Sequence, residues 1–479
     1  MNKGVDMAGH PSERRGYMWF IALITCMGSL LFGYNTAVVN GSLGFMSAKS
    51  QLALSPFNQG VVSSGLTLGA AFGAVLGGPL SDRMGRKRVL LWLGAIFSLG
   101  ALGCAWAPGA GILLVFRFIL GLAVGSASAN VPLFLAEVAP AHMRGQMVSM
   151  NQLMIVFGQF LSFGVNAWLG SAFGDNAAIW RLMLGVATIP GILLWVGMFF
   201  VPETPRWLAA HGRYKDAFNS LVRVRSNETA TSEMKEIKAA IQKDKKQEEK
   251  AASLADFKKP WILQIVITGA TLGVIQQFAG INSVMYYGTQ ILEASGFGSK
   301  AALISNVANG LFSCIGAVIG MYTVDRLGRK FLEYSGLTVC AVCLVCVGLL
   351  RTFANGASWS GVAVMIIVLI YIVFFQGTLG PVTWLINSEI FPARYRGLGT
   401  GITIFVLWFA NFLVGLFFPV MLSVLGLATS FYIFAACCVL GLFFVHARIP
   451  ETKGVQLEEV ESYFRAKYDK DYEGTSAIK

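Results

Sequence analysis

Charged side chains are scarce in this sequence. Asp, Glu, Lys and Arg make up 13 % of its 479 residues, whereas 55 % of the residues are hydrophobic and the mean hydropathy is +0.63. A soluble globular protein carries roughly twice that charged fraction. The composition therefore argues against a soluble protein and places the chain in a lipid bilayer.

Groups that could perform catalysis are also scarce. The four histidines lie in the N-terminal segment or near the expected ends of apolar runs, and no phosphate-binding glycine loop or nucleophile beside a base occurs. Cys340, Cys343 and Cys346 have a spacing that could suggest a metal site, but no histidine lies near them, and cysteine is a common small buried residue. We therefore expect no enzyme activity, no catalytic residue, no metal and no cofactor.

Long apolar runs are what the sequence does have. Each is about 20 residues or more, which is enough to cross about 30 Å of hydrocarbon as a helix. Twelve such runs are predicted to span the membrane: 18–40, 57–80, 89–107, 110–136, 147–170, 180–201, 261–292, 301–324, 331–353, 361–388, 398–421 and 428–447.

The cations predict the orientation. If both termini are cytosolic, only Lys49, Arg117, Arg181, Lys300 and Arg351 of the 37 Lys and Arg residues lie outside the cytosolic segments. The net charge of +12 then reflects topology, and no nucleic-acid partner is needed to explain it. The first apolar run is too long for a signal peptide and lacks a clear cleavage site, so we expect it to be retained.

The chain contains a duplicate of itself. Three motifs occur twice in the same order between apolar runs: Asp-Arg-x-Gly-Arg-Lys at 82–87 and 325–330, a Glu-x-x-Pro-Ala segment ending in Arg-Gly at 137–145 and 389–397, and Pro-Glu-Thr at 202–204 and 450–452. Many transporters consist of two similar halves that move about a site between them. The predicted organisation is a cytosolic N-terminus (1–17), a six-helix half (18–202), a cytosolic linker with short helices (203–260), a second six-helix half (261–449) and a cytosolic tail (450–479).

The repeated motifs predict a cytosolic latch between helices. A carboxylate at a helix C-terminus, such as Asp82, opposes the local dipole and needs a cation or another helix N-terminus. Arg144 or Arg396, with Glu137 and Glu389, could join adjacent helices in one conformation and release them in another. The alternative is that these charges only fix topology. The predicted latch residues are Asp82, Arg83, Arg86, Glu137, Arg144, Asp325, Arg326, Arg329, Glu389 and Arg396.

Polar side chains share the middle layer of the membrane. At 1.5 Å per residue, six of them lie about 16–24 Å from the cytosolic ends of their spans. Amides there are costly unless paired, and amides beside an indole suit a polyhydroxylated ring. The alternative is that these side chains hydrogen-bond between helices. For Asn411 the sequence favours neither ligand contact nor this alternative. These residues are Gln159, Gln276, Gln277, Gln376, Trp408 and Asn411.

Glycine and proline predict local geometry. Gly69, Gly73 and Gly77 recur every four residues, which lets helix backbones approach closely. Gly380-Pro381 should bend the tenth span, because proline removes a backbone hydrogen bond and clashes one turn earlier. This bend could act as a gate.

Together these motifs resemble the sugar porter family of the major facilitator superfamily, from about residue 18 to 454. The motifs that carry the resemblance are Gly33-Tyr34, both Asp-Arg-x-Gly-Arg-Lys loops, Arg117 followed by Gly121, Pro202 to Arg206, Gln276-Gln277 with Gly280-Ile281-Asn282, Gly380-Pro381 with Trp384, and Pro450 to Gly454. The resemblance implies an all-α membrane protein with twelve transmembrane helices in two pseudo-symmetric halves. It also implies transport by alternating access.

The resemblance adds to the predicted site. In relatives, residues that match Gln159, Gln276, Gln277, Asn282 and Trp384 contact the sugar. The chain departs from many relatives at Leu407, where they have an amide, and at Ser313, where they have asparagine; Asn309, about one turn away, could compensate. This pattern is similar to the bacterial inositol and polyol branch, so myo-inositol is the first expected substrate and a hexose or pentose the second.

Proton coupling is where the chain departs most from its relatives. Proton-coupled members usually carry an aspartate where this chain has Asn35, facing the arginine that matches Arg117. Both residues lie about 26–28 Å from the cytosolic side by the same arithmetic. No other Asp or Glu is expected deep in a span, because Glu137, Glu293 and Glu389 lie at span ends. The chain is predicted to be uncoupled; the alternative is a proton symporter whose coupling Asp has been replaced or lies elsewhere.

Other functions are weighed against transport. A nutrient receptor that binds sugar without transporting it is an alternative, although such a receptor would be expected to have a long signalling tail. The expected partners are a small polyhydroxylated substrate, the lipid bilayer, and protons if transport is coupled. We expect a functional monomer in the cell membrane, in a bacterial inner membrane.

Overall fold

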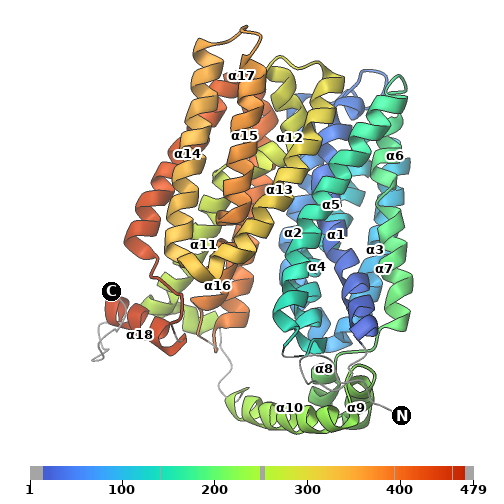
Figure 1. Ribbon diagram of the computed structural model, residues 1–479, viewed down its shortest axis with the longest axis vertical. Helices are drawn as coiled ribbons and strands as arrows, with labels where there is room; N and C mark the ends of the chain where they lie inside the picture. The colour runs from blue at the N-terminus through green and yellow to red at the C-terminus, as the bar shows by residue number, and fades with distance from the viewer. Residues whose placement is uncertain (1–14, 141, 249–253, 393, 456, 470–479) are drawn as a thin grey trace, which may run out of the picture.

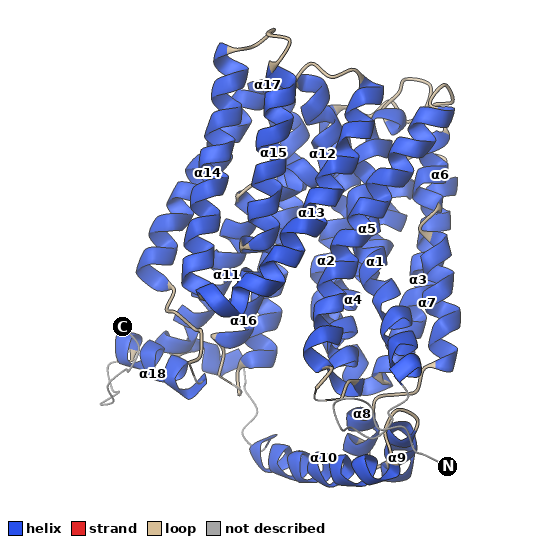
Figure 2. Ribbon diagram, in the orientation of Figure 1, coloured by secondary structure: helices blue, strands red, loops and turns tan. Residues whose placement is uncertain are grey.

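The computed structural model describes residues 15–140, 142–248, 254–392, 394–455 and 457–469. Within these ranges the regular elements are helices and no strand occurs (Figure 2). The predicted N-terminal segment 1–17 lies mostly outside the described residues, as does the end of the predicted tail 450–479. Helices dominate because, in hydrocarbon, a helix satisfies the backbone N–H and C=O groups within the segment itself.

The first half contains six spans, of which the sixth consists of two successive helices. Its helices are α1 (Arg15–Met46), α2 (Pro56–Met84), α3 (Arg86–Trp106), α4 (Ala110–Val138), α5 (Arg144–Phe173), α6 (Ile179–Gly185) and α7 (Thr188–Phe200). The helices pack closely where glycine is present. An added Cβ on Gly121 of α4 would overlap the carbonyl oxygen of Leu66 on α2, and one on Gly73 would overlap that of Leu122. Small residues therefore allow the backbones of α2 and α4 to touch.

The second half has the same number of spans, although its helices are interrupted differently. They are α11 (Pro260–Phe278), α12 (Ile281–Ala294), α13 (Ser299–Leu327), α14 (Arg329–Phe353), α15 (Ser360–Gly377), α16 (Leu379–Glu389) and α17 (Arg396–Arg448). A straight α17 would be about 80 Å long, far more than a bilayer core. It turns back at Gly426, which has φ 77° and ψ 171°. The described residues therefore contain the twelve predicted spans.

Two spans are broken near the middle of the membrane. The seventh is interrupted between α11 and α12 at Gly280, which adopts φ 93°. The tenth is interrupted between α15 and α16 at Thr378, with φ −130° and ψ −83°. Pro381 lies three residues after this break, consistent with the predicted effect of proline on the preceding turn.

The two halves lie side by side (Figure 1), and in the described part of the chain they pack against each other mainly along three helix pairs. Helix α1 packs against α12, α2 against α17, and α5 against α13. The start of α1 and helix α18 (Leu457–Tyr468) lie at the same side of the molecule. We call this the terminus side.

A small helical unit lies at the terminus side. It contains α8 (Pro205–Ala210), α9 (Tyr214–Val222) and α10 (Asn227–Glu248), and the short helix η1 (Leu254–Lys258) precedes α11. Trp207, Leu221 and Ile237 are buried in a separate apolar cluster within the unit. The unit is anchored to the first half by Arg225, which donates to the carbonyl of Val138 at 3.0 Å and pairs with Glu233 at 2.7 Å.

Candidate functional site

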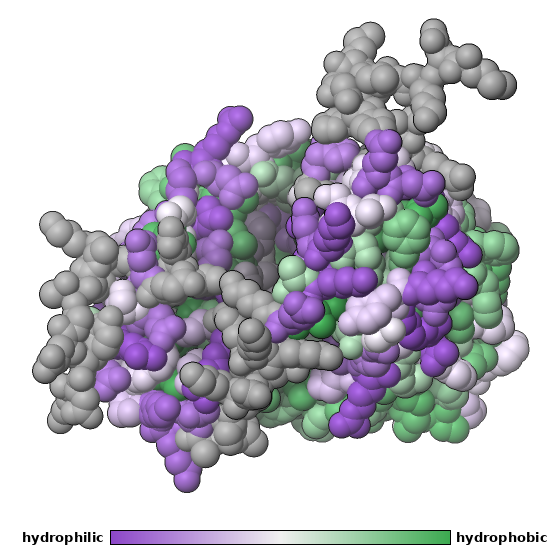
Figure 3. Space-filling view, turned by 90° about the horizontal axis from the view of Figure 1, so that it is seen from below, coloured by the Kyte–Doolittle hydropathy of each residue, from purple (hydrophilic) through white to green (hydrophobic). Residues whose placement is uncertain are grey.

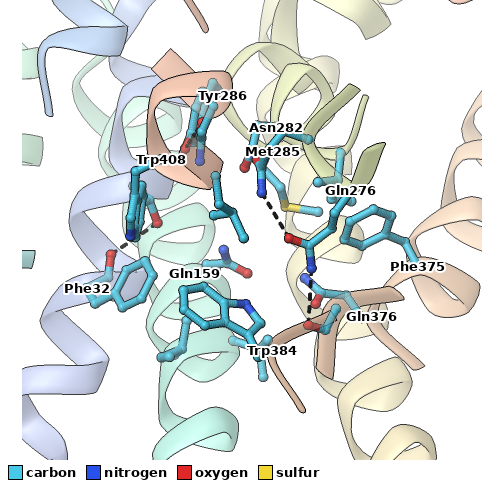
Figure 4. Close-up of a pocket in the computed structure, with 18 of the residues that line it drawn as sticks. Phe32, Gln159, Gln276, Asn282, Met285, Tyr286, Phe375, Gln376, Trp384 and Trp408 are labelled. Carbon is cyan, nitrogen blue, oxygen red and sulfur yellow. Dashed lines mark hydrogen bonds between the residues drawn. The ribbon is translucent and has the colours of Figure 1, made fainter. Parts of the chain in front are cut away.

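A cavity with an empty volume of about 670 Å³ lies between the two halves. Polar and aromatic side chains from α1, α5, α11, α12, α15, α16 and α17 line it, and several of them point toward one another in Figure 4. From the terminus side, Figure 3 shows a recess between the halves with hydrophilic residues at its border. Of the predicted substrate-binding residues, the cavity is lined by Gln159, Gln276, Gln277, Asn282, Gln376, Trp384, Trp408 and Asn411.

Three amides on one side of the cavity form a chain. Gln276 Nε2 donates to the carbonyl oxygens of Leu379 at 2.9 Å and Gly380 at 3.2 Å. Gln277 Nε2 donates to Gln276 Oε1 at 3.0 Å, and Asn282 Nδ2 donates to Gln277 Oε1. The chain therefore begins at carbonyls in the first turn of α16, directly after the break in the tenth span, and ends at Asn282, directly after the break in the seventh, so it ties both irregular regions to the cavity.

Two polar atoms in the cavity have no hydrogen-bond partner among the described residues. Gln159 Oε1 and Trp408 Nε1 are both buried and make no hydrogen bond to the described residues. The Trp408 ring lies against Phe32, with ring centroids 5.5 Å apart and a tilted geometry. A buried acceptor and a buried donor without partners are costly. A hydroxylated ligand could satisfy both, because each hydroxyl can donate and accept.

Sequence reasoning missed several lining residues. Phe32 and Thr36 from α1, Gln152 from α5 and Tyr286 from α12 all line the cavity. Gln152 precedes Gln159 by two helical turns, so it lies on the same face of α5, and this spacing could have identified it. Tyr286 donates its hydroxyl to Asn411 Oδ1 at 3.1 Å, which gives Asn411 a partner within the protein.

Asn309 does not line the cavity. Its Nδ2 donates to Asn306 Oδ1 at 2.7 Å, and Asn306 donates to Thr289 Oγ1 at 2.8 Å. Thr289 in turn donates both its hydroxyl and its backbone N–H to Asn40 Oδ1, at 2.7 and 2.8 Å. Asn40 donates to the carbonyl of Met285 at 2.8 Å. This network, which we call the Asn40 network, joins α1 to α12 and α13.

Arg117 is fully buried on α4 and is surrounded by backbone carbonyls. Its guanidinium donates to Val62 O at 3.3 Å, to Asn35 O at 3.2 Å and to Ser63 O at 3.2 Å. The Asn35 side chain donates to Leu31 O at 2.9 Å. The predicted neighbours therefore meet through the backbone of Asn35, and no carboxylate forms an ion pair with Arg117 in the described residues.

The repeated motifs form equivalent contacts in each half. Arg86 pairs with Asp82 at 2.8 Å and Glu137 at 3.3 Å, and Arg329 pairs with Asp325 at 3.3 Å and Glu389 at 3.1 Å. The cation of each cluster is thus an arginine of the Asp-Arg-x-Gly-Arg-Lys motif. Among the described residues, the other predicted latch cations, Arg83, Arg144, Arg326 and Arg396, form no ion pair.

The Pro-Glu-Thr motifs bind the same turns. Glu203 accepts hydrogen bonds from the backbone N–H of Lys87 at 3.0 and 3.2 Å, and Glu451 accepts from those of Arg329 at 2.9 Å and Lys330 at 3.1 Å. Burial raises the pKa of the Glu203 carboxyl above its usual range, and the N–H groups of Lys87 and Thr204 oppose that rise. Each carboxylate meets the positive end of the helix that follows the turn.

One carboxyl inside a span was missed by the sequence reasoning. Glu333 lies in the first turns of α14 and is 1 % exposed, and its Oε1 accepts a hydrogen bond from Thr383 Oγ1 on α16 at 2.7 Å. Glu333 lies near the terminus-side end of its span, so it leaves the expectation of no further Asp or Glu deep in a span as it was, but its burial was not foreseen. Its nearness to the end of an apolar run hid the fact that the helices around it exclude water.

Two six-helix halves around a polar cavity, with broken helices at that cavity, define the class of membrane transporters. A family model described as "Sugar (and other) transporter" matches residues 21–464. The major myo-inositol transporter IolT of Bacillus subtilis is 44 % identical over 457 residues, which cover 95 % of this chain and 96 % of IolT.

Solved structures of the xylose transporter XylE from E. coli are similar throughout. Its inward open conformation matches with a TM-score of 0.80 and 31 % identity, covering 93 % of this chain and 100 % of that one. The proton:xylose symporter XylE bound to 6-bromo-6-deoxy-D-glucose matches with a TM-score of 0.76 and 30 % identity, covering 94 % and 99 %. The chain belongs to the sugar porter family of the major facilitator superfamily. It is a multi-pass membrane transporter of sugars or polyols and not an enzyme.

Proposed function

We propose that the chain carries myo-inositol, or secondarily a hexose or pentose, across a bacterial inner membrane by alternating access. The observation that carries this proposal is the cavity between the halves, where Gln159 Oε1 and Trp408 Nε1 lack partners beside a chain of three amides. Polyols present many hydroxyls that donate and accept, together with C–H faces that pack on an indole. The similarity to IolT supports myo-inositol as the first candidate.

The proposed cycle follows from the contacts between the halves. The Asn40 network closes the cavity on the side opposite the termini, whereas the motif clusters of each half make their ion pairs within that half. The described conformation then opens toward the terminus side, and similarity to the inward open XylE structure supports this. We place the terminus side in the cytosol, because the loops there carry most of the Lys and Arg residues. The chain functions as a monomer.

The proposed transport is uncoupled from protons at the position that relatives use. The Asn35 side chain cannot titrate, and Arg117 is satisfied by three backbone carbonyls. A proton symporter whose carboxylate has been replaced at position 35 is the competing account. The similarity to a structure described as a proton:xylose symporter supports this competing account.

Counterflow in proteoliposomes tests the proposal. Liposomes loaded with unlabelled myo-inositol should take up labelled myo-inositol, and parallel assays use glucose and xylose. Gln277→Ala should abolish most of the exchange, since it removes the middle amide of the chain, and Gln242→Ala, on the exposed face of α10, should leave it unchanged. The absence of exchange with any of the three substrates would contradict the proposal.

A further inference from the structure

We propose that Glu333 is a proton-binding site through which the pH on the terminus side controls the position of α16 and hence the rate of exchange. This inference rests on the proposed function, because the rate in question is that of substrate exchange across the membrane. It also rests on the placement of the terminus side in the cytosol. The contact itself, between the Glu333 carboxyl on α14 and the Thr383 hydroxyl on α16, needs neither assumption.

Three contacts along one face of α14 hold α16. Arg329 pairs with Glu389 at 3.1 Å near the terminus side, Glu333 accepts from Thr383 at 2.7 Å one turn further in, and Gly336 lies so close to Thr378 that an added Cβ would overlap its hydroxyl. Positions 329, 333 and 336 share one helical face, as spacings of four and three residues require. We call these contacts the α14–α16 seam.

The seam is continuous with the transport site. Thr383 is followed directly by Trp384, which lines the cavity. The first residues of α16, Leu379 and Gly380, provide the carbonyls that anchor Gln276. A shift of α16 against α14 therefore moves an aromatic lining residue and the anchor of the amide chain together.

Glu333 has no cation partner in the described part of the chain, and the neighbouring charges are engaged elsewhere. Arg329 is paired with Asp325 of α13 and Glu389 of α16. Lys330 donates to the carbonyl of His446 on α17 at 3.3 Å. The thiol of Cys340 on α14 interacts electrostatically with Glu333, and Cys340 in turn interacts with the thiol of Cys438 on α17 and the phenol of Tyr371 on α15; none of these three groups supplies a positive charge.

A buried carboxyl with a neutral hydroxyl as its partner has two states with different packing needs. The neutral acid accepts the Thr383 hydrogen bond and stays buried. When the acid releases its proton to water, the carboxylate must be hydrated, because an ionised group without a cation is costly to bury. Ionisation therefore loosens the α14–α16 seam, and rebinding of the proton closes it.

The position of the site decides what the proton does. Glu333 lies only one turn from Arg329, whose partner Asp325 is largely exposed at the terminus side. Its proton is exchanged with that side alone, so no proton crosses the membrane with the substrate. The pH of the cytosol then changes the rate of exchange, while a pH gradient drives no accumulation through this residue.

Hydrogen exchange measured by mass spectrometry tests the seam without substrate. The full chain in nanodiscs is compared with Glu333→Gln, a neutral isostere of the proton-bound state, at matched pH from about 6 to about 8.5. Exchange in the exposed α10 peptide is used to correct for the intrinsic effect of pH on amide exchange. After this correction, amides of residues 379–389 should exchange about tenfold faster in the parent than in Glu333→Gln at the upper pH, and at equal rates in the two proteins at the lower pH. If the corrected exchange rate of residues 379–389 in the parent is the same at both pH values, the inference is overturned.

Counterflow at equal pH on both sides gives the second readout. The parent rate should fall about tenfold from about pH 6 to about pH 8.5, because a loosened α16 occludes the substrate poorly, whereas Glu333→Gln should keep the low-pH rate throughout. Thr383→Ser, which retains the hydroxyl, should keep the parent profile, and Glu236→Gln on exposed α10 is the matched control. A parent rate without pH dependence would overturn the inference and leave the proposed function intact. If hydrogen exchange depends on pH but no substrate is transported, the inference about the α14–α16 seam is supported and the proposed function is contradicted.

Discussion

Arg117 Nη1 donates to the backbone carbonyl oxygen of Asn35 at 3.2 Å, while the side chain of Asn35 turns to the carbonyl of Leu31. Two further carbonyls, those of Val62 and Ser63, complete the surroundings of the guanidinium. An intramembrane arginine is costly and needs partners. Here it finds them in the backbone, so its charge is accommodated without a group that titrates.

Asn35→Asp should therefore introduce proton coupling. A carboxylate cannot donate to the Leu31 carbonyl as the Asn35 amide does, so it would turn to Arg117; loss of its proton would form an ion pair with Arg117, and protonation would release it. Labelled substrate in proteoliposomes should accumulate up to about tenfold per unit of imposed pH gradient in the variant, and not in the parent. Asn176→Asp, in an exposed loop, is the matched control. Accumulation driven by the gradient in the parent would show that protons are carried by another group.

Trp408→Phe should weaken substrate binding with little effect on the fold. The substitution keeps an aromatic ring against Phe32 but removes Nε1, the buried donor without a protein partner. Loss of one hydrogen bond to substrate corresponds to about 1 kcal/mol, or roughly fivefold in Kd. Isothermal titration calorimetry measures the change, with Trp92→Phe on the exposed side of α3 as the control. An unchanged Kd would mean that the indole N–H does not face the ligand.

Asn40→Ala should loosen closure on the side opposite the termini. The substitution removes the acceptor of the Thr289 N–H and hydroxyl and the donor to Met285. A buried donor left without a partner costs about 1–3 kcal/mol, so amides in Ile281–Ala294 should exchange about tenfold faster or more. Hydrogen exchange of this peptide is the measurement, and Asn58→Ala at the exposed start of α2 is the control. Unchanged protection would remove the Asn40 network from the proposed cycle.

Gly85→Ala and Gly328→Ala should destabilise the two halves in parallel. The two glycines adopt φ 100° and φ 90°, which cost an L-residue about 1–2 kcal/mol. An added Cβ would also overlap the Glu203 carboxylate in one half and lie 2.7 Å from Glu451 Oε2 in the other. Thermal unfolding in detergent should show a lower Tm for each variant.

Gly164→Ala gives the matched control for these two variants. Gly164 lies within α5, and an added Cβ there meets nothing within 4 Å, so alanine should keep or raise the Tm because it favours helix. If Gly85→Ala and Gly328→Ala keep the parent Tm, the turns of the two motifs do not depend on glycine.

Much of the architecture could be predicted because its causes are local in sequence. An apolar run of bilayer length specifies a span, and the duplicated motifs at 82–87 and 325–330 indicate two similar halves that make similar turns. The depth of an amide follows from its position in a span, so the middle-layer residues Gln159, Gln276 and Trp408 were brought together as expected. The bend near Pro381 followed from the missing backbone N–H.

The partners of these residues could not be predicted in the same way. Sequence reasoning assigned the latch cations to Arg144 and Arg396 as well, but the described ion pairs use Arg86 and Arg329. Asn309 was expected near the substrate, yet its side chain joins the Asn40 network. A helix at the right depth can present a side chain in any direction around its axis, and only the packing of its neighbours fixes which direction it takes.

The sequence by itself thus determined the number of spans, the duplication and the layer in which polar groups gather, because hydrophobic length and helical rise act along the chain. The tertiary structure alone decided that Arg117 rests on carbonyls and that Gln276 is anchored at the broken tenth span. It also decided that Glu333, near the end of its apolar run, is sealed against Thr383. Burial and hydrogen-bond pairing depend on which side chains and carbonyls a neighbouring helix presents. In these three cases the neighbour is 50, 82 and 103 residues away in the sequence.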